Sequence, residues 1–280
     1  MLLVLSDIHI GTRTDLISLV TLLGKLPETP TAVVDLGDVV DHYRIYDEQM
    51  TFIYTSQALA AAALYRHIVD EYCDRGAPIY LVLGNHDRRP WNDGLWPRLL
   101  EAVRALNLRL ELVNGSVVRY GRRTVMAIHG EQLSGRASPY GASPSALFTT
   151  LLLVWAAWRR CPEINTVLVG HFHGAPHVRR VGERGRAYVS AEEMLDVVFM
   201  PSFQWSHKVV GMARAIALLP PSMDEKPRLI TGTQHPLSGS EELAAMLNAE
   251  LVKHFFMFKK GEKPPTLEET VAEVAELVAA

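Results

Sequence analysis

Five short apolar runs of the chain, each strand-like, lead directly into motifs rich in histidine, aspartate and asparagine. Because open α/β folds gather the exits of neighbouring strands at one edge of a sheet, we expect these side chains to lie together. The pattern therefore predicts a layered α/β fold with a site at that edge. In chain order, the runs and motifs are residues 1–5 before Asp7-Ile8-His9, residues 32–36 before Gly37-Asp38-Val39-Val40-Asp41, residues 79–83 before Gly84-Asn85-His86-Asp87, residues 125–128 before His129-Gly130, and residues 167–169 before Gly170-His171-Phe172-His173.

The side chains in these motifs are metal ligands by type. Asp7 and His9 are two residues apart, which on an extended strand places both on one face. A single histidine in apolar surroundings, such as His129, is usually a hydrogen-bonded core residue. However, five of the 11 histidines fall inside the motifs. Carboxylate oxygens together with imidazole nitrogens predict a site for two divalent transition metals.

The ordered set of motifs resembles the calcineurin-like metallophosphoesterase superfamily over roughly residues 1–175. The resemblance implies an α/β fold, a four-layer αββα β-sandwich, here with a C-terminal helical extension. It also implies two metal sites that share Asp38 as a bridge. One would be held by Asp7, His9, Asp38 and His173, and the other by Asp38, Asn85, His129 and His171.

The resemblance implies further that His86 faces the scissile phosphate without binding metal, with Asp87 as its orienting partner. An imidazole of ordinary pKa is well matched to donating a proton to a leaving oxygen near neutral pH. One position departs from the family pattern, because Asp41 is followed by His42 where many members have arginine. The phosphate contacts of that arginine then fall to His42, Arg44 or Arg88.

The substrate is less constrained than the chemistry. Arg88, Arg89 and Trp91 follow the third motif and, with His42, are the candidate substrate contacts. They favour a phosphodiesterase or nuclease acting on nucleic acid or nucleotide. The alternatives are a phosphomonoesterase acting on nucleotide or phosphoprotein, a lipid-linked pyrophosphate hydrolase, and a non-catalytic scaffold. The complete ligand set argues against the scaffold. Manganese is the expected metal, although the ligands also admit Fe, Zn, Ni or Co.

Composition bounds the remaining possibilities. The chain has 280 residues and a formal net charge of −3, which gives no bulk attraction to nucleic acid or anionic membranes. Cys73 and Cys161 are expected to be reduced thiols, and the first strand leaves no room for a signal peptide. The longest apolar stretch, residues 146–158, is shorter than the ~18 residues of a spanning helix. We therefore expect a cytoplasmic protein without membrane insertion.

The predicted organisation is a catalytic domain over residues 1–235 and a helical extension over 236–280. The pattern at residues 268–277 is typical of a solvated tail helix or of an element for homo-oligomerisation. Residues 201–208 fit either a wall of the substrate cleft or a buried edge. The other predicted elements are helices at 15–26, 47–75, 95–106 and 145–160, a loop at 134–145, strands at 177–181, 186–189 and 213–219, and a hairpin of strands 109–113 and 116–120.

Overall fold

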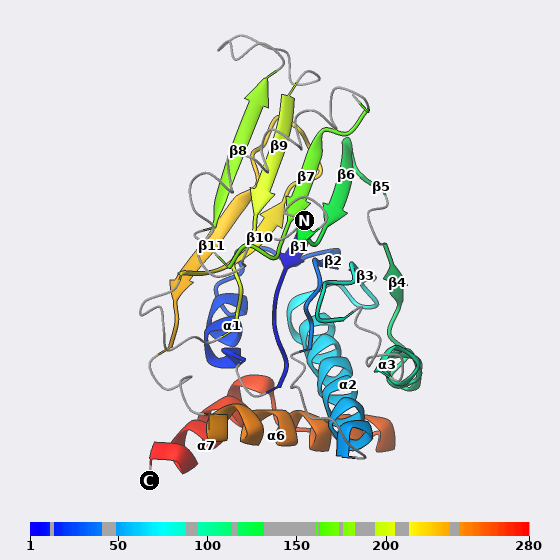
Figure 1. Cartoon of the computed structure of the whole chain (residues 1–280), viewed down its shortest axis with the longest axis vertical. Helices are drawn as coiled ribbons and strands as arrows, with labels where there is room; N and C mark the ends of the chain where they lie inside the picture. The colour runs from blue at the N-terminus through cyan, green and yellow to red at the C-terminus, as the bar shows by residue number, and fades with distance from the viewer. Residues whose placement is uncertain are drawn as a thin grey trace.

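Two β-sheets and a set of helices make up the chain in the computed structural model (Figure 1). The predicted helix at 145–160, the loop at 134–145 and the strand at 186–189 lie outside the residues that the structure describes. Those described residues are 1–11, 14–40, 49–87, 95–113, 117–131, 161, 163–173, 176–182, 194–204, 213–235 and 241–279.

The first sheet has six strands in the order β11-β10-β1-β2-β3-β4. Strands β1 to β4 pair in parallel with their neighbours, so their carboxyl ends lie at one edge of the sheet. Strand β10 pairs antiparallel with both β1 and β11. Every residue of β1 and β2 is buried, which explains the successive apolar residues at 2–5 and 32–34. The strands are β1 (Leu2–Leu5), β2 (Ala32–Asp35), β3 (Ile79–Leu81), β4 (Leu110–Leu112), β10 (Ala213–Leu219) and β11 (Arg228–Thr233).

The second sheet has five strands in the order β5-β6-β7-β9-β8. The central strands β6, β7 and β9 are parallel, and an antiparallel strand flanks them on each side. Alternate residues of β6 and β7 therefore point toward the first sheet. The strands are β5 (Val117–Tyr120), β6 (Arg123–Ile128), β7 (Thr166–Val169), β8 (His177–Gly182) and β9 (Met194–Phe199).

Apolar side chains from both sheets meet in one cluster, which includes Val4, Val34, Ala127 and Leu168. A larger cluster joins the other face of the first sheet to the helices, which pack against it (Figure 1). The predicted α/β sandwich is confirmed. The helical elements are α1 (Leu16–Leu23), α2 (Gln49–His67), the π-helical turn η1 (Ile68–Tyr72), α3 (Leu95–Ala105), α6 (Glu241–Lys260) and α7 (Leu267–Ala279).

The C-terminal helices are part of this core. Leu247, Leu251 and Phe255 of α6 are buried in the same cluster as the residues of α2. In Figure 1, α6 and α7 run across the lower end of the molecule, with α6 lying against α2. The outward glutamates of α7, such as Glu268 and Glu273, are exposed as the helical pattern predicts. The boundary between two domains near residue 235 stays a prediction.

The predicted hairpin of strands 109–113 and 116–120 is wrong. The strands at 109–113 and 116–120 do not form a hairpin, because β4 pairs with β3 and β5 pairs with β6 in the other sheet. The chain therefore passes from the first sheet to the second between β4 and β5. Residues 201–204 are buried, which fits the core interpretation of that segment.

Cys73 and Cys161 are free thiols, as expected. Among the described residues, no helix combines the length and apolarity that crossing a membrane requires.

Candidate metal centre

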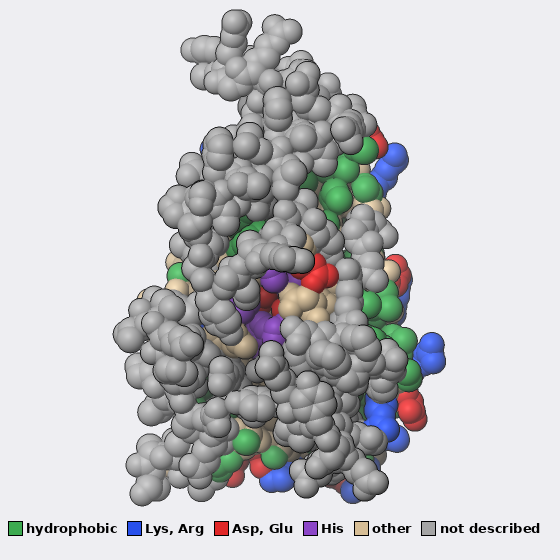
Figure 2. Space-filling view, in the orientation of Figure 1, with side chains coloured by type: hydrophobic (Ala, Val, Ile, Leu, Met, Phe, Trp, Pro, Cys, Tyr) green, Lys and Arg blue, Asp and Glu red, His purple; other side chains and the backbone are tan. Residues whose placement is uncertain are grey.

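The described parts of the five motifs follow β1, β2, β3, β6 and β7, so two sheets deliver them to one place. Figure 2 shows histidine side chains gathered near the middle of one face of the molecule, with an acidic side chain beside them. The ligand residues are nonetheless buried: His9, His129 and Asp7 are 0% exposed. The predicted convergence at the carboxyl ends of the strands is what the structure contains.

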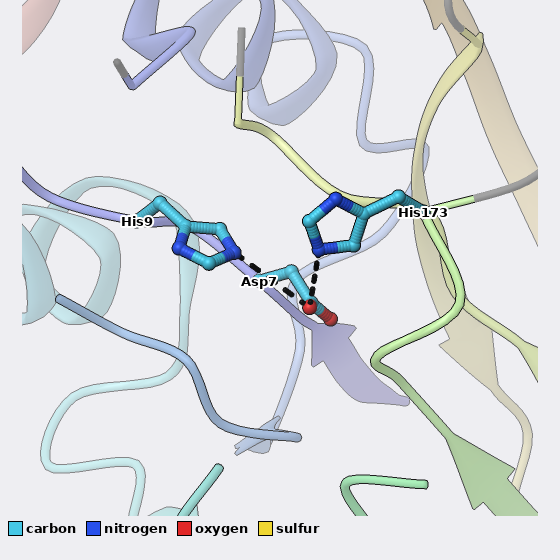
Figure 3. A group of neighbouring side chains, drawn as sticks. All are labelled: Asp7, His9 and His173. Atoms are coloured by element: carbon cyan, nitrogen blue, oxygen red, sulfur yellow. Dashed lines mark ion pairs between the residues drawn. The ribbon is translucent and has the colours of Figure 1, made fainter. Parts of the chain in front are cut away.

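The first group consists of Asp7, His9 and His173. Nε2 of His173 lies 3.2 Å from Oδ1 of Asp7, and Nε2 of His9 lies 3.8 Å from the same oxygen. Figure 3 shows the two imidazoles directed at the same carboxylate oxygen of Asp7. Three ligand atoms, one from each residue, lie within 4.8 Å of one another, which is close enough to share one cation.

The second group consists of Asp38, His129 and His171, again with ligand atoms within 4.8 Å of one another. Nε2 of His129 lies 3.3 Å from Oδ2 of Asp38 and 3.2 Å from Oδ1 of Asn85. Asn85 therefore adds a neutral oxygen at the same point. Nε2 of His9 lies 3.9 Å from Oδ2 of Asp38, which connects the two groups through this carboxylate.

His86 lies at the edge of the two groups. Its Nε2 is 3.9 Å from Oδ2 of Asp38, and its ring centroid is 4.8 Å from that of His9. The side chain of His86 is 20% exposed, whereas that of His9 is completely buried. His86 is therefore the most exposed histidine of this cluster.

The backbone of the centre adopts a conformation that most residues avoid. Asp7, His9, Asp38 and His171 have φ between 50° and 68°, in the left-handed region. Such residues cost of order 1 kcal/mol or more each and concentrate at functional sites. The prediction that Asp7 and His9 lie on one face of an extended strand is wrong. β1 ends at Leu5, so Asp7 and His9 converge through left-handed turns and not along an extended strand.

Glycines let the loops approach closely enough to form the centre. A Cβ on Gly84 would lie 2.1 Å from Oδ1 of Asp38, and one on Gly170 would lie 2.2 Å from Oγ of Ser6. These distances are far below van der Waals contact, so a side chain at either position would displace a carboxylate or its hydrogen-bond donor. The glycine that precedes the ligands in two of the motifs is thus explained by space.

The charges of the centre favour a bound cation. Burial tends to raise the pKa of Asp7 and Asp38, but the neighbouring imidazoles, His129 first, hold the pKa of both carboxyls well below its usual range. Burial lowers the pKa of His171 to about 4 and also lowers the pKa of His173. These two imidazoles are therefore neutral at pH 7, which is the form that binds metal.

Further contacts orient the ligands. Nδ1 of His129 lies 2.8 Å from the carbonyl oxygen of Leu36, so it donates there, and Nε2 faces Oδ2 of Asp38. Burial tends to lower the pKa of His129, but the carboxylate of Asp38 raises it to about 10. Oδ2 of Asp7 accepts hydrogen bonds from the backbone N–H of His171 at 3.0 Å and from Ser6. Nδ1 of His171 is buried and has no hydrogen-bond partner among the described residues. A buried imidazole nitrogen of this kind fits a metal ligand.

Asp87 makes contacts that the sequence did not predict. Its Oδ2 accepts hydrogen bonds from the backbone N–H of Asp38 at 2.8 Å and of Gly84 at 2.9 Å. The carboxylate thus ties the second and third motifs together. Burial raises the pKa of Asp87 to about 6, with the nearby carboxylate of Asp38 acting in the same direction. The role of Asp87 as orienting partner of His86 stays a prediction.

Sequence reasoning missed Asp35, which supports the same turn. The hydroxyl of Tyr65 donates to Oδ2 of Asp35 at 2.8 Å, and the N–H of Gly37 donates to Oδ1 at 3.0 Å. An aspartate inside a buried apolar strand was the available signal. The predicted substrate contacts His42, Arg88, Arg89 and Trp91 lie outside the described residues.

A family model described as calcineurin-like phosphoesterase matches residues 1–200. A solved metallophosphoesterase from Sphaerobacter thermophilus is 16% identical, with 92% of this chain and 99% of that chain covered and a TM-score of 0.42. The nuclease MPE from Pseudomonas putida is 16% identical, with coverages of 82% and 87% and a TM-score of 0.32. Vps29 from Entamoeba histolytica is 15% identical, with coverages of 84% and 99% and a TM-score of 0.40. No curated protein matches the chain.

Proposed function

The chain belongs to the calcineurin-like phosphoesterase family, and on this premise we propose that it hydrolyses a phosphodiester with two divalent cations. The observation that carries the proposal is the pair of buried carboxylates, each approached by imidazoles. Asp7 lies between His9 and His173, and Asp38 lies beside His129. A pair of buried anions in such surroundings is expensive unless cations neutralise it.

Two sets of side chains would each hold one cation. One set consists of Asp7, His9, Asp38 and His173, and the other consists of Asp38, Asn85, His129 and His171. Cations in this arrangement supply Lewis-acid charge to the phosphoryl oxygens and activate a water molecule for attack. Manganese suits the mixture of oxygen and nitrogen ligands.

His86 is the proposed general acid. Its partly exposed imidazole lies at the edge of the centre, where it can donate a proton to the leaving oxygen. Proton donation of this kind typically contributes 10²–10⁴-fold, on the order of what loss of the imidazole should cost. The loss should be larger for substrates with poor leaving groups. Equal activity of His86→Ala and the unaltered protein on an alkyl phosphodiester would refute this role.

Metal binding is the first test. The purified protein is stripped of metal, and Mn²⁺ binding is measured by titration calorimetry for the unaltered protein and for Asp38→Asn. Asp224→Asn is the matched control, because Asp224 is exposed and lies in the turn before β11. We expect two Mn²⁺ sites in the unaltered protein and the control, and weakened binding in Asp38→Asn. A protein that binds no divalent metal would overturn the proposed function.

The substrate class is tested with the Mn²⁺-loaded protein. We expect faster hydrolysis of bis-p-nitrophenyl phosphate than of p-nitrophenyl phosphate, with both activities lost in Asp38→Asn. The preference for a diester rests on Arg88, Arg89 and Trp91 of the sequence. Preference for the monoester would identify a phosphatase instead. A metal-loaded protein inactive on both compounds would direct the search to pyrophosphates.

A further inference from the structure

A buried arginine in an otherwise apolar strand lies behind the metal centre. Arg214 of β10 is 0% exposed, and its Nε donates to Oδ2 of Asp15 at 2.9 Å. Removing both charges from water is costly, and a buried ion pair is weak support for stability by itself. The Arg214–Asp15 ion pair is therefore expected to do more than stabilise the fold.

The guanidinium of Arg214 donates hydrogen bonds to the loop of residues 202–204, which follows β9. Nη1 donates to the carbonyl oxygen of Ser202 at 2.6 Å, and Nη2 donates to that of Gln204 at 3.0 Å. Nη2 also donates to Oε1 of Gln234 at 3.0 Å. A planar group with several fixed donors can hold both carbonyls and Asp15 at once, whereas the single ammonium of lysine cannot span them.

The 202–204 loop in turn donates hydrogen bonds to the backbone of Asp7, a proposed metal ligand. The backbone N–H of Phe203 donates to the carbonyl oxygen of Asp7 at 2.8 Å, and Oγ of Ser202 lies 3.2 Å from the same oxygen. Oγ of Ser202 also accepts from the N–H of Gln204 at 2.8 Å, which fixes its orientation. These bonds act on Asp7 where its φ is 50°, a conformation that needs external support.

Asp15 fixes the other side of the arrangement. Its Oδ1 accepts from the N–H of Ser18 at 3.2 Å and caps helix α1. Its own N–H donates to the carbonyl oxygen of Phe203 at 2.8 Å. The Arg214–Asp15 pair therefore joins β10, α1 and the 202–204 loop into one unit behind Asp7.

We propose that Arg214 is a positioning residue for the metal centre. Through the 202–204 loop it holds the backbone of Asp7 in the left-handed turn that aims the carboxylate at the cation. This inference rests on the proposed function, because it assigns Asp7 as a metal ligand. Arg214 touches neither substrate nor metal, and its effect passes through Ser202 and Phe203.

The chain contains a matched control. Arg123 of β6 is also a buried arginine, and its Nη1 donates to Asp196 at 2.8 Å with both side chains 0% exposed. It donates as well to backbone oxygens, including that of Pro220 at 2.6 Å. The hydrogen-bond partners of Arg123 among the described residues lie in the second sheet and in the turn after β10, and none of these partners is a proposed metal ligand. Loss of Arg123 thus removes a similar buried network from elsewhere in the fold.

The test compares Arg214→Lys with Arg123→Lys. Mn²⁺ affinity is measured by titration calorimetry on metal-stripped protein, at a temperature well below the melting temperature of each variant, and the melting temperature is measured without metal. We expect both variants to melt at lower temperature. Only Arg214→Lys should bind Mn²⁺ more weakly, by about 10-fold or more, as is typical when the support of a metal ligand is lost.

A smaller change tests the same path if Arg214→Lys does not fold. Ser202→Ala removes only the hydroxyl that contacts Asp7 and Gln204, and it should also weaken Mn²⁺ binding. Affinities in Arg214→Lys and Ser202→Ala that equal those of the unaltered protein would overturn the positioning role. In that case Mn²⁺ binding by the unaltered protein would leave the proposed function standing, so the two failures are distinguishable. An unaltered protein that binds no Mn²⁺ would overturn both.

Discussion

Acidification should destabilise the fold through one buried histidine that joins three helices. Nε2 of His67 lies 2.8 Å from Nδ1 of His254, whose Nε2 lies 2.8 Å from Oγ1 of Thr270. The hydroxyl of Thr270 donates to the carbonyl oxygen of Thr266, so it accepts from His254, and Nδ1 of His254 accepts from His67. Nδ1 of His67 is buried without a partner among the described residues, so a second proton there has no acceptor.

The size of the effect follows from the pKa of His67. Burial, followed by repulsion from His254 and Arg66, lowers this pKa from 6.5 to about 4. The unfolded chain therefore binds more protons than the folded one between these values, and stability falls as the pH falls. Above pH 6.5 the contribution is fully present. The loss amounts to about 2 kcal/mol at pH 5 and about 3 kcal/mol at pH 4.

Urea unfolding followed by circular dichroism at pH 7.5 and pH 5 measures this loss, with His67→Gln as the reference. Glutamine can still donate to His254 but does not titrate. All other groups are present in both proteins, so the difference between their pH dependences reports the titration of His67 together with its interaction with His254. We expect the free energy of unfolding to fall by about 2 kcal/mol more in the unaltered protein. Equal losses in the two proteins would refute the reasoning.

Two further substitutions test the support of the metal centre. Gly84→Ala places a Cβ 2.1 Å from Oδ1 of Asp38 and should weaken Mn²⁺ binding about 10-fold or more by calorimetry. Gly24→Ala is its control, since the nearest atom to that Cβ is 3.6 Å away, and wild-type affinity for both would contradict the packing argument. Tyr65→Phe removes a buried hydrogen bond to Asp35 and should lower the free energy of unfolding by about 1–2 kcal/mol in urea at pH 8. An unchanged value would mean that this bond contributes nothing to stability.

Local sequence determined many of the elements of this protein and its candidate metal ligands. The apolar runs at residues 2–5 and 32–34 lie in fully buried parallel strands, because a strand covered on both faces can be apolar at successive positions. Parallel strands deliver the residues after their carboxyl ends to one edge. For this reason Asp7, Asp38 and Asn85, which follow β1, β2 and β3 of one sheet, could be predicted to converge from their places in the chain alone. His129 follows β6 of the second sheet, so the packing of the two sheets brings it to them.

The tertiary structure decided how the ligands converge and what holds them there. The left-handed turns at Asp7 and Asp38 are hydrogen-bonded to distant segments: the N–H of Phe203 donates to the carbonyl oxygen of Asp7, and the N–H of Asp38 donates to the carboxylate of Asp87. Packing between two sheets also sent β4 and β5 into different sheets despite their Asn-Gly connection. Pairing of Arg214 with Asp15 spans 199 positions of the chain. Local patterns report on neighbours a few residues away, so contacts at such separations become visible only when the chain has folded.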